Sequence, residues 1–273
     1  MTEVAEGVVS EEARRSSWRA VAIPSEHGGW GLTAEPIALG LLLACSWAGA
    51  TIGLAALLAF VARTPLKLAW IDHRRGRSLE RTRLAWRIGV AETVALVVLA
   101  GFSVALAGWT WLVPVAAAVP LVAVELWFDV RSRSRRLMPE LCGGVGMAAV
   151  VAAIVVAGGG DGRLALAAWV VLAARSLTAI PFVRVQIARL RHGATDRRAS
   201  DRFQLVGVVA AALAWVVDPT VIGGSLAVGL IAVLQFWWSR RLPVPPVKIL
   251  GLRQMALGFT IVGATAVSVL VLA

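Results

Sequence analysis

Long apolar runs recur along almost the whole chain and limit it to one kind of fold. Each run approaches the roughly 20 residues that a helix needs to cross a hydrocarbon core about 30 Å thick. Lipid offers no hydrogen-bond partner to backbone groups, so such segments must be helical. Only 16% of the residues are charged, whereas soluble domains contain about 25%. The sequence therefore predicts an all-α, polytopic transmembrane helical bundle.

The apolar runs also predict the number of helices and the domain organisation. We expect about nine spans, near residues 28–48, 51–70, 88–108, 109–127, 141–158, 164–182, 203–218, 220–238 and 254–272. The polar segment before them lacks the apolar core of a cleavable signal peptide. We therefore expect residues 1–22 to form a disordered cytoplasmic arm and residues 23–273 to form a single transmembrane domain.

Basic residues gather in every second connection between the runs. Four connections are rich in Arg and Lys, whereas Arg163 is the one basic residue expected on the opposite side. Loop Lys and Arg mark the cytoplasmic side of a membrane protein. This pattern predicts a cytoplasmic N-terminus, an external C-terminus and a multi-pass protein of the plasma (inner) membrane. The net charge of +11 is then a feature of topology, with membrane lipids as partners and no nucleic acid.

Ionisable residues inside apolar runs are the clearest functional signal. Each costs about 2.5–3.5 kcal/mol at a helix centre and usually faces a partner inside the bundle. Arg175 lies deep in the sixth run and is expected to pair with Glu35 or Glu92, as a structural bridge or as part of a site. Glu125 and Asp129 are four residues apart, which favours either a site or an intrahelical pair with Arg133.

Basic residues near the cytoplasmic ends of spans two and six predict a ligand site. Arg63 and Lys67 share a helical face if the helix continues through Pro65. Cations on one face repel one another unless an anion neutralises them, which suggests a phosphate, diphosphate or carboxylate ligand. Snorkelling to lipid headgroups is the alternative. The candidate ligand-binding residues are Arg63, Lys67, Asp72, Arg175 and Arg184.

Three residues at the start of the first span are candidates for acid–base chemistry. Glu26 and His27 precede the apolar run, and Glu35 lies within it beside Pro36, where we expect a bend. A histidine titrates near neutral pH and can move a proton, but an interfacial histidine without a catalytic role fits equally well. The three His are scattered and no Cys-x-x-Cys occurs, so no metal site is predicted.

Two segments resemble a known family. "IPSEHGGWGLTAEPIALGLLLA" (Ile23–Ala44) and "RTPLKLAWIDHRRGR" (Arg63–Arg77) are similar to signature segments of the YwiC-like bacterial membrane proteins. That resemblance covers nearly the whole chain in the number of spans and the placement of loops. It implies little biochemistry, because the family has no settled activity.

A more distant resemblance is to the UbiA superfamily of intramembrane prenyltransferases. "WFDVRSRSRRLMPELCGGVGMA" (Trp127–Ala148) and "IDHRRGRSLERT" (Ile71–Thr82) are similar to segments of that superfamily. The resemblance implies nine helices, a cytoplasmic N-terminus and active-site loops after helices two and six. The first aspartate-rich motif of that superfamily, Asn-Asp-x-x-Asp-x-x-x-Asp, is degenerate here. If Asp72 is its last aspartate, Thr64, Pro65 and Leu68 occupy the positions of the earlier Asn and Asp residues. Mg²⁺ on a diphosphate needs carboxylate oxygens, so no cofactor is predicted.

Three functions stay open at this point. The first is a UbiA-like bundle whose cytoplasm-facing cavity binds an anionic lipid or prenyl phosphate. The second is a proton-coupled transporter that uses Glu35, Glu92 and Arg175 as an intramembrane relay. The third is a non-catalytic accessory subunit of a membrane complex. The sequence does not decide whether the protein is an enzyme.

Overall fold

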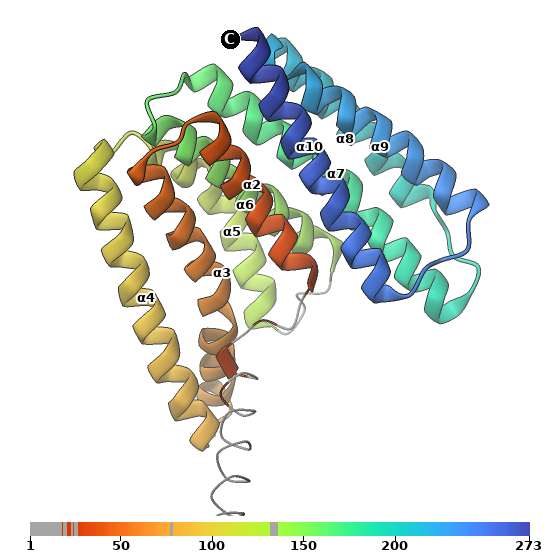
Figure 1. Ribbon diagram of the computed structural model, residues 1–273. Coiled ribbons are helices and arrows are strands. Elements are labelled where there is room, and N and C mark those ends of the chain that lie inside the picture. Colours follow the sequence, from red (N-terminus) through yellow and green to blue (C-terminus); the bar gives the residue numbers. More distant parts are fainter. Residues whose placement is uncertain (1–17, 19–20, 23, 25–26, 77–78, 132–135) are drawn as a thin grey trace, which may run out of the picture.

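The computed structural model describes residues 18, 21–22, 24, 27–76, 79–131 and 136–273, and the regular structure of this part is entirely helical (Figure 1). Its long helices are α2 (His27–Leu43), α3 (Trp47–Arg74), α4 (Glu80–Ala107), α5 (Leu112–Val130), α6 (Leu137–Ala157), α7 (Gly162–His192), α8 (Arg198–Val217), α9 (Ile222–Arg241) and α10 (Val247–Leu272). A short 3₁₀ helix, η1 (Pro219–Val221), leads into α9.

Each predicted span corresponds to one of these nine helices in the described part of the chain. Eight of the helices are long and apolar enough to cross a membrane. The remaining helix, α2, has 17 residues and is therefore about 26 Å long at 1.5 Å per residue. That length is near the lower limit for a membrane span. The fold is thus the predicted polytopic helical bundle.

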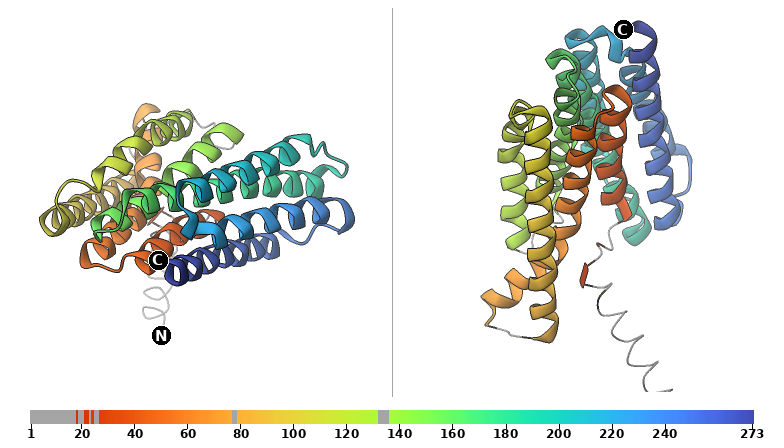
Figure 2. Two further views of the ribbon diagram at one scale, coloured as in Figure 1. Left: turned by 90° about the horizontal axis from the view of Figure 1, so that it is seen from above. Right: turned by 60° about the vertical axis from the view of Figure 1, so that its left-hand side comes forward.

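The helices form two groups of four with α2 between them. Figures 1 and 2 show α3, α4 and α5 on one side of the bundle and α8, α9 and α10 on the other. The central helices α6 and α7 pack against each other, and α2 packs against both α6 and α10. Small apolar residues fill this centre, with Leu39 of α2, Val151 of α6 and Ala168 of α7 in one buried cluster. Small residues allow close approach of helices where lipid provides no hydrophobic driving force.

Several helices extend beyond the apolar runs that predicted them. The structure ends α3 at Arg74 and α7 at His192, and α4 begins at Glu80. Polar residues continue these helices past the apolar boundary, where water can solvate their side chains. Proline does not end the helices either: α2, α3 and α7 continue through Pro36, Pro65 and Pro181.

Residues that precede α2 contact the ends of α3 and α4. Val21 and Ala22 are buried, and Val21 belongs to an apolar cluster with Ala69 of α3 and Ala85 of α4. Residues 1–17, which make up most of the predicted disordered arm, lie outside the described part of the chain.

Candidate functional site

Glu35 of α2 and Arg175 of α7 form an ion pair inside the bundle. Their side chains are 3% and 2% exposed, and the carboxylate Oε1 lies 3.6 Å from the guanidinium Nη2. Glu35 is one of the two partners that the sequence predicted for Arg175. The guanidinium is held more closely by α10, because Nη2 donates to the carbonyl oxygen of Gln254 at 2.6 Å and Nη1 to its Oε1 at 3.3 Å.

A line of glutamines continues from this ion pair across three more helices. Gln235 of α9 donates from Nε2 to Oε1 of Gln254 at 3.3 Å. Gln204 of α8 donates from Nε2 to Oε1 of Gln235 at 2.9 Å and to the carbonyl oxygen of Thr178 at 3.0 Å. All three glutamines are buried. We call Glu35, Arg175, Gln254, Gln235 and Gln204 the glutamine network.

Three polar atoms of the glutamine network have no hydrogen-bond partner in the described part of the protein. They are the donors Nε of Arg175 and Nε2 of Gln254 and the acceptor Oε1 of Gln204. Turning the amide of Gln254 would place its NH₂ group against two donors, so its orientation is fixed by Arg175 and Gln235. An unmade hydrogen bond at a buried polar group costs about 1–3 kcal/mol. The network therefore retains hydrogen-bonding capacity for a polar molecule.

Glycines allow the helices of the glutamine network to approach closely. A methyl group at Gly258 of α10 would collide with the carboxyl group of Glu35, and one at Gly207 of α8 would collide with the side chain of Thr178. The first glycine makes room for the carboxylate, and the second brings Gln204 within reach of α7. The sequence thus builds the network from polar residues and from the small residues that face them.

A second group of charges joins α3 to α5. Arg63 contacts Asp129 through Nε at 2.6 Å and Glu125 through Nη1 at 2.5 Å, and Nζ of Lys67 lies 2.9 Å from Asp129. We call these four residues the ion-pair cluster. Helix α3 continues through Pro65, so Arg63 and Lys67 do share a face. The acids pair between helices, whereas Arg133, their expected intrahelical partner, lies outside the described residues.

The other candidate ligand-binding residues lie in separate places. Asp72 accepts a hydrogen bond from Thr82 at 2.7 Å and lies 3.5 Å from Nε of Arg81, across the α3–α4 turn. Arg184 of α7 pairs with Glu140 of α6 at 2.8 Å. Among the described contacts, Arg63 and Lys67 belong to one group and Arg175 to another. Each candidate cation has a carboxylate partner within the protein.

Of the predicted acid–base residues, Glu35 is the one whose side chain the structure places. Glu26 lies outside the described residues, and His27 is described only as the first backbone position of α2. Glu92, the other proposed member of a proton relay, lies on α4, which packs chiefly against α3. It is not a member of the glutamine network. Its Oε2 is buried without a hydrogen-bond partner in the described part of the chain.

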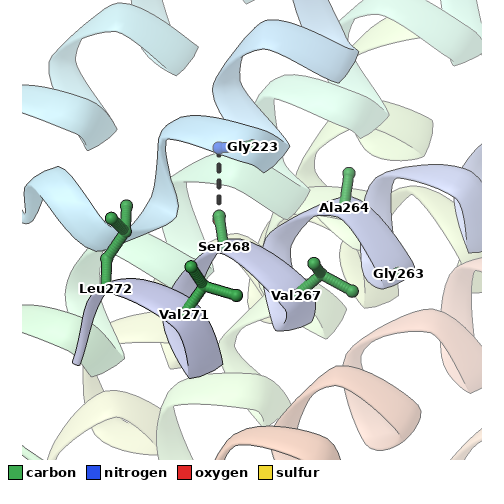
Figure 3. Close-up of a pocket in the computed structure, with 7 residues that line it drawn as sticks. All are labelled: Gly223, Gly263, Ala264, Val267, Ser268, Val271 and Leu272. Atoms are coloured by element: carbon green, nitrogen blue, oxygen red, sulfur yellow. Dashed lines mark hydrogen bonds between the residues drawn. The ribbon is translucent and has the colours of Figure 1, made fainter.

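The pocket drawn in Figure 3 lies away from both polar groups. Its lining comes from the start of α9 and the last turns of α10 and is almost entirely apolar, with Gly223, Val267 and Val271 among its residues. The backbone N–H of Gly223 donates to Ser268 Oγ at 3.2 Å. This is a helix-packing feature rather than a polar site.

Comparison with known proteins adds one relationship. Residues 23–157 match the family described as YwiC-like protein. This YwiC-like segment is just under half of the 273-residue chain. It contains both quoted signature segments, Glu35 and the whole ion-pair cluster. It ends before α7, so Arg175 and the three glutamines lie beyond it. No curated protein and no solved structure matches the chain.

The glutamines are the functional candidates that sequence reasoning missed. Gln204, Gln235 and Gln254 carry no charge and therefore did not stand out among the many Arg and Glu residues. A signal was available, because each lies within or beside an apolar run, where an amide needs a hydrogen-bond partner. Their mutual proximity depends on how α8, α9 and α10 pack, which the sequence pattern does not specify.

Proposed function

We propose that this protein is a membrane carrier for a small polar solute and that the glutamine network is its substrate site. The observation that carries the proposal is the set of unpartnered atoms on Arg175, Gln254 and Gln204. They lie on three different helices, α7, α10 and α8. Polar and ionisable residues inside membrane segments commonly mark substrate or ion pathways.

The arrangement of helices suits such a carrier. The ion-pair cluster joins α3 to α5 within one helix group, whereas the glutamine network joins α7–α10 to α2, which lies between the two groups. Buried contacts between α6 and α7 are made largely by small apolar residues. Carriers of this general type move one helix group against another around a site near the middle of the membrane.

Uptake into proteoliposomes tests the proposal with three probes of different charge. Radiolabelled pyruvate, glycine and glycerol represent an anion, a zwitterion and a neutral polyol. We expect the full chain to accelerate entry of at least one probe relative to protein-free liposomes. Gln254→Met should reduce that rate about tenfold, because it removes one donor and one acceptor worth about 1–3 kcal/mol.

The control variant is Gly263→Ala, which lies on the same helix at a position where a methyl group meets nothing within 4 Å. It should transport at the wild-type rate. Rates equal to those of protein-free liposomes for all three probes, from a monodisperse and thermally stable preparation, would overturn the proposal.

A second candidate function is the binding of an anionic lipid or prenyl phosphate, as in the UbiA-like hypothesis. Partial exposure of the basic side chains favours it: Arg63 is 29% and Lys67 34% exposed. A ligand would share these cations with Glu125 and Asp129. Native mass spectrometry of the wild type beside Arg63→Ala tests this candidate. A retained anionic lipid that the variant loses supports it, and equal retention by both proteins opposes it.

A further inference from the structure

The charge balance of the glutamine network restricts what its substrate can be. The network contains one cation, Arg175, and one carboxylate, Glu35, and their side chains are 2% and 3% exposed. A buried pair is tolerable because its charges cancel, whereas an uncompensated buried charge is very costly. An anion that entered alone would leave one net negative charge in the bundle.

The bonding of Arg175 shows how that charge can be compensated. Gln254 holds the guanidinium through two hydrogen bonds of 2.6 and 3.3 Å, whereas Glu35 lies at 3.6 Å. Arg175 therefore remains in place if the carboxylate of Glu35 becomes neutral. Helix α10 presents Gly258 to this carboxylate, and its uncharged Met255 lies, like Oε1 of Glu35, within 4 Å of the place that a methyl group at Gly31 would take. Arg175 is the one charged group that contacts Glu35 in the described part of the chain.

The unpartnered donors supply the place for an incoming anion. Nε of Arg175 and Nε2 of Gln254 are both buried without a partner in the described structure, and the two side chains are bonded to each other. Two N–H donors, one of them on the guanidinium itself, match the oxygens of a carboxylate. One donor is thus on the cation that loses its own carboxylate when Glu35 is protonated, and the other is on the glutamine that holds this cation.

We infer that the substrate is a small monovalent organic anion and that it binds together with one proton, which neutralises Glu35. This inference rests on the proposed carrier function. One proton from water converts the Glu35 carboxylate to a carboxylic acid, and one anion pairs with Arg175, so the network stays neutral overall. The carrier then moves one proton and one anion without net transfer of charge.

Pyruvate accumulation in proteoliposomes of the full chain tests the inference. We expect an inward acid gradient to drive accumulation above the level in protein-free liposomes, and a potassium–valinomycin potential to leave the rate unchanged. Glu35→Gln should abolish the acid-driven accumulation, because the amide does not take up a proton. The matched control is Asp201→Asn, which alters an ion pair with Arg240 that is partly exposed and lies outside the network.

A second measurement needs no variant at Glu35. Pyranine trapped in wild-type vesicles should report acidification of the lumen when pyruvate is added, one proton for each anion. Pyruvate uptake without acidification, or uptake that follows the membrane potential, would overturn the inference. Uptake of glycine or glycerol but not of pyruvate would also overturn the inference, but the proposed carrier function would still hold. Failure of all three probes overturns the carrier function itself.

Discussion

Two carboxyl groups inside this bundle, those of Glu35 and Glu125, lie against glycines of neighbouring helices. A methyl group at Gly258 would overlap the carboxyl group of Glu35, and one at Gly143 would lie 2.5 Å from the carboxyl carbon of Glu125. Each glycine is on a helix other than the acid's own. Glu35 and Glu125 therefore each depend on a neighbour without a side chain as well as on a basic partner.

Gly258→Ala should lower stability by about 1–3 kcal/mol, because overpacking a close helix contact strains the surrounding side chains. Thermal unfolding in detergent measures the effect. Gly263→Ala on the same helix is the control, since open space surrounds that position and alanine favours a helix by up to about 1 kcal/mol. Equal unfolding temperatures for the two variants would contradict the packing of Glu35 against Gly258.

Asp129 of the ion-pair cluster should contribute more to stability than Asp201, a partly exposed acid that also pairs with an arginine. Asp129 has a 4% exposed side chain and contacts both Arg63 and Lys67, whereas Asp201 is 27% exposed and contacts Arg240. Asp129→Asn should cost about 1–3 kcal/mol, since two cations lose charged hydrogen bonds. Asp201→Asn should cost about 0–1 kcal/mol.

Thermal unfolding of the two variants, in parallel with the wild type, compares these costs. If Asp129→Asn is no more destabilising than Asp201→Asn, the α3–α5 pairing contributes nothing to stability. If a simultaneous Lys67→Met change restores the unfolding temperature, the cost arises from the positive charge of Lys67 that Asp129 no longer neutralises.

The helices themselves were the most predictable elements, and the polar contacts between them the least. Apolar length predicts a span directly, because lipid leaves the backbone no other structure. Helix ends such as Arg74 and His192 lie in polar sequence and give no such signal. Spacing placed Arg63 beside Lys67 and Glu125 beside Asp129 on their own helices. That these two faces meet each other depends on packing between α3 and α5.

Helix α4 is the least buried of the eight candidate membrane spans, with 6% of its apolar window buried. It packs chiefly on α3, with Ser103 buried and bonded to Thr51 at 2.7 Å, while Val97 and Phe102 are exposed. We therefore expect a nitroxide at Val97→Cys to be accessible to oxygen, which dissolves in lipid. A nitroxide at Ala85→Cys, a position with no exposure, should be protected from oxygen and from a polar nickel complex.

Electron paramagnetic resonance in a Cys45→Ser, Cys142→Ala background measures both accessibilities. Protection of Val97 from oxygen would mean that protein rather than lipid covers this face, as in an assembly with another membrane protein. That outcome would favour the accessory-subunit hypothesis over an independent carrier.

At the scale of the whole molecule, composition and apolar patterning predicted the bundle, whereas the site was predicted only in part. Glu35 with Arg175 was one of two expected pairs, and it is present at 3.6 Å. The expected convergence of Arg63 and Arg175 on one ligand is not seen among the described contacts. Those residues lie in different helix groups, and apolar length and charge spacing do not indicate which helices pack against each other.

Orientation in the membrane is the remaining property of the whole molecule, and a native cysteine reports it. Cys45 is exposed between α2 and α3, whereas Cys142 is buried in α6. Basic loops predict that the α2–α3 connection faces outward. A membrane-impermeant maleimide should therefore label Cys45 in intact cells, and Cys45→Ser should remove that labelling. In the Cys45→Ser background, Ala194→Cys in the basic α7–α8 connection should be labelled only after the cells are opened. The opposite pattern would invert the bundle and place its basic loops outside the cell, against the rule that loop Lys and Arg face the cytoplasm.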